Sequence, residues 1–197
     1  MRVSWDEVLE SIRTCEKCPL RRGCTQTVPG EGDPHARLMF IGEGPGAEED
    51  RLGRPFVGAS GQLLDKMIAA IGMTRDQVYI ANIVKCRPPQ NRQPAPEEAA
   101  ACLPYLRAQT GLIRPEVIVL LGATAAKYTI SPDIRITRDR GRWIEKKGVW
   151  MMPTYHPSAL LRDPSLKRAA WADFQAVRDK LKETEQNGRA GLGPSEG

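Results

Sequence analysis

The sequence lacks long hydrophobic runs and contains little histidine or asparagine. No stretch of its 197 residues approaches the roughly 18 apolar residues of a transmembrane helix, which excludes a membrane-spanning protein. Only two histidines and three asparagines are available to any site that needs these side chains. The first ten residues, MRVSWDEVLE, carry acids where a secretory signal peptide has its apolar stretch. We therefore expect a cytoplasmic protein that binds no membrane.

The composition is that of one globular domain with a mild excess of positive charge. Hydrophobic residues make up 41% of the chain, enough for a domain of this length to bury a core. Lysine and arginine number 29 against 24 acids, and the resulting net charge of +5 favours anionic partners such as nucleic acid. We expect a monomer with one folded domain over residues 1–184 and a flexible, glycine-rich tail over residues 185–197.

Apolar runs that end near glycine alternate with helical patterns along the chain. Strands are predicted at 37–41, 78–84, 117–121 and 149–154. Helices are predicted at 6–13, at 60–71 with Ser60 as the N-cap, from Pro96 onward, at 123–128 and at 168–182. This alternation is typical of an α/β fold, here a three-layer αβα sandwich with a mainly parallel central sheet.

Three polar loops follow predicted strands at their carboxyl ends. They are the glycine loop from Gly42 to Gly46, the segment that begins at Asn82, and the segment from Tyr155 to Ser158. Ligands of parallel α/β sheets bind at the carboxyl ends of the strands. We therefore expect these three loops to form the functional site.

The glycine loop is a weak match to a dinucleotide-binding fingerprint. Gly42, Gly44 and Ala47 satisfy the G-x-G-x-x-G/A pattern after a strand. Three carboxylates at positions 48–50 stand where a helix would receive a pyrophosphate, and they would repel it. We therefore expect no nucleotide cofactor. The glycines instead let backbone N–H groups approach a flat ligand, with Glu43 pointing into the cleft.

The chain has five cysteines, four of which form two spaced pairs. Cys15 and Cys18 form a C-x2-C motif, and Cys86 and Cys102 lie further along the chain. In a cytoplasmic protein such spacing points to metal binding rather than to disulfides. Zinc and a [4Fe-4S] cluster both fit, and Cys24 could replace one of the four ligands. The alternative is that Cys86 and Cys102 are small buried hydrophobic residues.

The two histidines lie in different contexts. His35 is in a loop rich in glycine and proline, which favours a solvated surface position. His156 directly follows a predicted strand, and its neighbours Tyr155 and Pro157 restrict its ring, although a buried structural histidine is the alternative. Ser158 lacks the G-x-S-x-G context of a serine nucleophile, so a nucleophilic role is disfavoured.

Two further features point to ligand contacts. Phe56 lies in a glycine-bounded loop over residues 53–58, where it can serve as a stacking platform or pack beneath the loop. Residues 135–142 concentrate four arginines, including Arg138, Arg140 and Arg142. This run fits phosphate contacts as well as it fits a solvated hairpin.

Several of these motifs, in the same order, resemble family 4 uracil-DNA glycosylases. The motifs are GEGPG at 42–46 with the acids at 48–50, GRPFVG at 53–58, NIVKCRP at 82–88 and HPS at 156–158. The similarity runs from about residue 15 to residue 181. It implies an enzyme that hydrolyses the N-glycosidic bond of deoxyuridine in single- or double-stranded DNA, leaving an abasic site for base excision repair. It also implies a [4Fe-4S] cluster held by Cys15, Cys18, Cys86 and Cys102.

The resemblance assigns a role to each residue of the expected pocket. His156, together with backbone N–H groups of the glycine loop, would stabilise the departing uracil near its O2 atom. Asn82 would pair with O4 and N3–H, a pattern that cytosine reverses. Phe56 would stack on the ring, and Glu49 would crowd C5, where thymine carries its methyl group.

Access to a base inside a duplex requires that the base be flipped out of the stack. Residues 159–162 resemble the intercalating loop of the wider superfamily, with Leu160 or Leu161 as the wedge. The alternative is that these leucines begin a buried segment. Arg162 and the arginines between 135 and 142 would hold phosphates.

One departure concerns the hydrolytic water. The related family 1 enzymes carry an aspartate for this water where the present chain has Gly44. Glu43 is our first candidate to position the water and Asn91 our second. The main alternative function is that of a single-turnover protein that traps the sugar covalently through a histidine. The basic insertion of such proteins is absent after Phe56, which disfavours that reading. An iron–sulfur protein without catalysis would leave the pocket residues unexplained.

Overall fold

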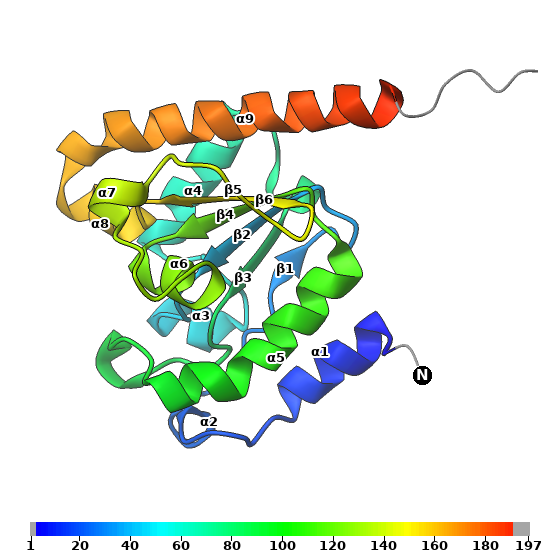
Figure 1. Cartoon of the computed structure of the whole chain (residues 1–197). Helices are drawn as coiled ribbons and strands as arrows, with labels where there is room; N and C mark the ends of the chain where they lie inside the picture. Colours follow the sequence, from blue (N-terminus) through cyan, green and yellow to red (C-terminus); the bar gives the residue numbers. More distant parts are fainter. Residues whose placement is uncertain (1–2, 191–197) are drawn as a thin grey trace, which may run out of the picture.

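The computed structural model describes residues 3–190 and contains a six-stranded sheet flanked by helices (Figure 1). The strands are β1 (Glu31–Gly32), β2 (Leu38–Gly42), β3 (Tyr79–Asn82), β4 (Val117–Leu121), β5 (Ile144–Lys146) and β6 (Val149–Thr154). They lie in the order β1-β3-β2-β4-β6-β5. The four central strands are parallel and the two edge strands antiparallel. The mainly parallel sheet predicted from the apolar runs is confirmed.

The helices are α1 (Trp5–Arg13), α2 (Leu20–Gly23), α3 (Ala47–Leu52), α4 (Ala59–Ala70), α5 (Pro96–Ile113), α6 (Ala123–Thr129), α7 (Ile136–Asp139), α8 (Pro157–Arg162) and α9 (Lys167–Ala190). Ser4 and Glu7 form a capping box at the start of α1, the first of the predicted helices. The cap predicted at Ser60 is wrong, because α4 begins one residue earlier with Gly58 as its N-cap. No helix within residues 3–190 has both the length and the apolar character needed to cross a bilayer.

The central sheet separates two buried clusters. Leu38 and Phe40 of β2 belong to one cluster, and Met39 and Ile41 belong to the other, because successive side chains of a strand point to opposite faces. Helices α4 and α9 cover the first face, while α1, α5 and α6 pack on the second (Figure 1). The arrangement is the three-layer αβα sandwich expected from the sequence.

Sequence reasoning missed the two edge strands and placed the end of the last helix too early. Strands β1 and β5 have only two and three residues, too few for an alternating pattern. Helix α9 continues to Ala190, past its predicted end at residue 182 and into the tail predicted from residue 185, because its glutamate, lysine and glutamine residues favour a helix. The rest of the predicted tail, residues 191–197, lies outside the described residues.

Candidate active site

A cavity of about 510 Å³ opens at the carboxyl ends of the parallel strands. The residues that line it include Glu43, Gly44, Pro45, Gly46, Glu49, Phe56, Ser60, Asn82, Asn91, Thr124, His156, Ser158 and Arg162. The segments that follow β2, β3 and β6 meet here, as predicted from the rule that ligands of parallel α/β sheets bind at the carboxyl ends of the strands (the strand-end rule). The segment that follows β4 is a fourth contributor, which the sequence prediction omitted.

The carboxylate of Glu43 is held by a residue that sequence reasoning missed. The hydroxyl of Thr124, in the first turn of α6 directly after β4, donates to Glu43 Oε2 at 2.5 Å. The strand-end rule applied to β4 would have found Thr124. Asn91, the second candidate to position the water, is exposed beside the cavity, and its Oδ1 accepts from Arg87 Nε at 2.8 Å.

The amide of Asn82 is buried but incompletely bonded. Its side chain is 1% exposed, and Oδ1 has no hydrogen-bond partner within the described residues. Gly42 at the end of β2 makes room for this amide, since a Cβ there would lie 2.5 Å from Asn82 Oδ1 and 2.5 Å from the Phe56 ring. A buried, unpaired oxygen at a cavity is energetically costly, so its partner is expected to be a ligand.

His156 is a neutral hydrogen-bond donor aimed at the cavity. It is the N-cap of α8, and its Nδ1 accepts from the backbone N–H of Ser158 at 3.1 Å, so the ring proton lies on Nε2. The hydroxyl of Ser158 lies 2.8 Å from the same Nδ1. The pKa of His156 is lowered from 6.5 to about 4, mainly by burial and to a smaller extent by the charge of Arg162, while Glu49 acts in the opposite direction. The ring is therefore uncharged at neutral pH.

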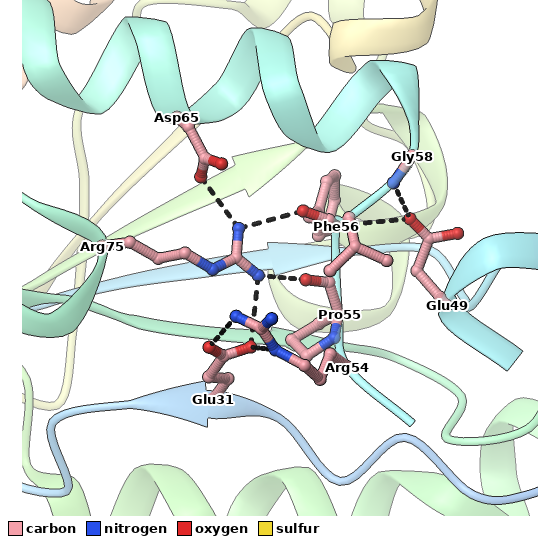
Figure 2. Close-up of polar contacts among 9 residues, drawn as sticks. Glu31, Glu49, Arg54, Pro55, Phe56, Gly58, Asp65 and Arg75 are labelled. Atoms are coloured by element: carbon pink, nitrogen blue, oxygen red, sulfur yellow. Dashed lines mark hydrogen bonds and ion pairs between the residues drawn. The ribbon is translucent and has the colours of Figure 1, made fainter. Parts of the chain in front are cut away.

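Phe56 packs beside His156 in an unusual backbone conformation. The two ring centroids are 5.6 Å apart, and Phe56 is buried with a φ of 51°, in the left-handed region. Glu49 on α3 holds the adjoining backbone, because its Oε1 accepts from the N–H groups of Val57 and Gly58, both at 2.8 Å (Figure 2). The carboxylate of Glu49 is thus fixed at the cavity between two loops.

The two leucines after the histidine motif have opposite environments. Leu160 is 1% exposed and belongs to the core, so the interpretation of Leu160 as a wedge is wrong. Leu161 is 44% exposed at the end of α8, next to Arg162, which lines the cavity. Only Leu161 of this pair can reach a DNA duplex.

The arginines between 135 and 142 are partly used within the protein. Arg140 donates to both carboxylate oxygens of buried Asp173 and to a backbone carbonyl, so phosphate binding by Arg140 is no longer expected. Arg138 forms a bidentate pair with Asp139 and keeps an exposed side chain. Arg142 is 68% exposed and approaches Asp139 only to 3.7 Å, so it is the most available of the three.

Four cysteines line a second, small cavity near α1 and α5. Cys15 and Cys18 face Cys86 and Cys102 there, and the backbone N–H of Lys85 donates to Cys102 Sγ at 3.3 Å. Burial raises the pKa of the Cys86 and Cys102 thiols. Residues 3–190 contain no group of three or more cysteine, histidine or acidic side chains that is close enough to hold a single metal ion.

The remaining cysteine, Cys24, does not line this cavity. Its thiol interacts with Arg21, accepting from a guanidinium nitrogen at 3.7 Å and donating to the backbone carbonyl at 3.6 Å. The Cys24 thiol also lies against the Cys86 thiol and helps to raise its pKa. The structure therefore gathers the four cysteines that the spacing and the resemblance singled out at one cavity, with Cys24 in contact with one of them.

Comparison with known proteins gives a consistent family. Residues 29–175 match the family model of the uracil DNA glycosylase superfamily. The chain is 46% identical to the type-4 uracil-DNA glycosylase of Sulfurisphaera tokodaii, over 89% of this chain and 84% of that protein. It is also 46% identical to the type-4 enzyme of Thermotoga maritima, over 89% of this chain and 93% of that protein. A type-5 uracil-DNA glycosylase of Pyrobaculum aerophilum is 33% identical over 79% of this chain and 83% of that protein. The chain therefore belongs to the uracil-DNA glycosylase superfamily and, within it, to the type-4 enzymes.

Proposed function

We propose that this protein removes uracil from DNA by hydrolysing the N-glycosidic bond of deoxyuridine, which leaves an abasic site for base excision repair. The observation that carries this proposal is the unpaired Oδ1 of Asn82, buried at the cavity beside Phe56 and His156. Family membership and the identity with type-4 enzymes point to the same reaction.

Asn82 supplies the recognition of the base. Its Oδ1 accepts from uracil N3–H and its amide nitrogen donates to O4, whereas cytosine offers an acceptor and a donor at these positions. A cytosine in the cavity would therefore leave buried polar groups unpaired, which is a strong basis for rejection. Phe56 adds a stacking surface, and Glu49, fixed by Gly58 and its neighbours, narrows the site at C5 against thymine.

His156 supplies the stabilisation of the leaving group. As the glycosidic bond breaks, negative charge develops on uracil and the sugar becomes oxocarbenium-like. The Nε2–H of a neutral imidazole donates to O2, where much of this charge collects. The lowered pKa of His156 keeps the ring uncharged at neutral pH, and the hydrogen bond that Nδ1 accepts from the Ser158 N–H leaves the single ring proton on Nε2.

Glu43 is the better candidate to position the hydrolytic water. It is partly buried at the cavity and oriented by Thr124, whereas Asn91 is exposed and bonded to Arg87. A fixed carboxylate can hold a water at the face of the sugar opposite the departing base. We retain Asn91 as a contact at the cavity mouth.

DNA contacts lie beside the cavity. Leu161 fills the gap left by the flipped base, and the cavity-lining Arg162 and the exposed Arg142 bind phosphates. Arg138 contributes less, because Asp139 neutralises its charge. We propose that the protein acts on DNA as a monomer in the cytoplasm.

Cys15, Cys18, Cys86 and Cys102 hold a [4Fe-4S] cluster in this proposal. Each thiolate of such a cluster binds a different iron atom, so the sulfurs stand further apart than around one zinc ion. Four thiols line one cavity, and the resemblance to type-4 enzymes favours a cluster over zinc at this place. When bound, the cluster would tie the segment after α1 to the loop after β3. The cluster would carry no step of the reaction.

The test is a turnover assay on DNA. Purified protein is incubated with excess uracil-containing oligonucleotide, treated with alkali and analysed on a denaturing gel, with a thymine-containing oligonucleotide as control. We expect several strand breaks per protein molecule at uracil and none at thymine. A covalent adduct that stops at one equivalent would favour the single-turnover alternative, and no product would refute the proposal. Broad absorbance at about 400 nm distinguishes a cluster from zinc.

A further inference from the structure

Arg75 lies on the side of the loop over residues 53–58, here called the Phe56 turn, that faces away from the cavity. It begins a short 3₁₀ helix (Arg75–Gln77) before β3, does not line the cavity, and has a side chain that is only 17% exposed. No motif in the sequence singles it out. Its guanidinium nevertheless contacts the turn that presents Phe56 (Figure 2).

The guanidinium binds two successive backbone carbonyls. Arg75 Nη1 donates to the carbonyl oxygen of Phe56 at 2.9 Å, and Nη2 donates to that of Pro55. Two acids fix the guanidinium from its other sides, since Nη1 lies 2.8 Å from Asp65 and Nη2 lies 3.5 Å from Glu31 (Figure 2). The planar fork of arginine suits this double contact, whereas a lysine offers a single point charge.

The Phe56 turn needs external support. A phenylalanine with a φ of 51° is strained, and such conformations persist only where neighbouring groups fix them. The peptide group that joins Phe56 to Val57 is held at both ends, by Arg75 on its carbonyl and by Glu49 on its N–H. Helix α4 packs against the same carbonyl, because a Cβ on Gly61 would lie 1.9 Å from that oxygen.

We propose that Arg75 is a positioning residue for uracil recognition, which holds the Phe56 backbone in its left-handed conformation so that the ring stays in place to stack on the base. This inference rests on the proposed function. Arg75 acts through Phe56 and touches no substrate atom. Loss of the Arg75 side chain lets the turn relax and moves the Phe56 ring. The side chains of Asn82, which recognises uracil, and of His156, which stabilises the leaving group, stay in place.

The expected signature is weaker binding rather than slower chemistry. Arg75→Ala is expected to raise the inhibition constant of free uracil and the KM for uracil-containing DNA about tenfold, the range of one lost base–aromatic contact, with a smaller change in kcat. Arg54→Ala is the matched control, because Arg54 binds Glu31, is 55% exposed and contacts neither carbonyl. It is expected to change both constants less than about twofold.

A double-mutant cycle with Phe56→Ala tests whether Arg75 acts through the ring. In the Phe56→Ala background, Arg75→Ala is expected to change the uracil inhibition constant no further. An equal loss in both backgrounds would overturn the proposal, as would a folded Arg75→Ala protein that binds uracil like the wild type. If Arg75→Ala does not fold, as judged by thermal melting, the same cycle is run with Arg75→Lys. Failure of the wild type to release uracil would instead refute the proposed function.

Discussion

The partly buried imidazole of His156 makes the stability of the protein depend on pH in a defined window. The folded-state pKa is about 4, against 6.5 for an ordinary histidine. Above pH 6.5 neither state binds the proton, and between about 6.5 and 4 only the unfolded state does. Stability is therefore fully present above 6.5 and is lost as the pH falls toward 4. A difference of about 2.5 pH units corresponds to about 3 kcal/mol.

The assay is urea unfolding of wild-type protein and His156→Gln, which keeps a neutral polar side chain but cannot be protonated. Between about pH 7.5 and pH 4 the wild type is expected to lose about 3 kcal/mol more unfolding free energy than the variant. Acid-dependent contributions that both proteins share cancel in this difference. A parallel decline of the two curves would refute the assignment of a neutral His156 with a lowered pKa. Proton NMR offers a second readout, because the only other histidine is the exposed His35.

Three further outcomes are expected from single substitutions. Asn82→Ala should lower kcat/KM for uracil about 100-fold through loss of two buried hydrogen bonds, and an unchanged rate would contradict its role in recognition. Leu161→Ala should slow excision from duplex DNA about tenfold more than excision from single strands, with unchanged protein stability. Leu160→Ala should instead cost about 2–5 kcal/mol of unfolding free energy. The reverse pattern would show that the wedge was misassigned. Cys102→Ser should abolish the broad absorbance at about 400 nm and lower the melting temperature. The matched Cys24→Ser should retain the absorbance and the wild-type melting temperature. Loss of the absorbance in Cys24→Ser would make Cys24 a ligand.

The fold could be predicted from sequence where the pattern is long. Four central strands are continuous apolar runs, because a parallel sheet is buried on both faces, and each run was found within one or two residues at most ends. The edge strands β1 and β5 are too short to have a pattern and are defined only by their pairing with β3 and β6. The first helical residue of α4 was misplaced because Gly58 caps it without a side-chain hydrogen bond.

The candidate site was predictable where its residues lie at the carboxyl ends of strands. Gly42 and Asn82 end β2 and β3, and His156 comes two residues after β6; all three were found because strand ends of a parallel sheet share one edge. Arg75 was not predictable, since its role depends on a turn that the chain forms 19 and 20 residues earlier in the sequence. The choice between Leu160 and Leu161 also required the structure: adjacent positions of a helix point about 100° apart, and only packing decides which one is buried.

The central claim is that a flipped uracil occupies the cavity and satisfies the unpaired oxygen of Asn82. A crystal structure of the protein soaked with uracil tests it most directly. We expect the base on the Phe56 ring, with N3–H donating to Asn82 Oδ1 and O2 within hydrogen-bond distance of His156 Nε2. Uracil bound elsewhere, or bound in the cavity with Asn82 Oδ1 still unpaired, would contradict the claim.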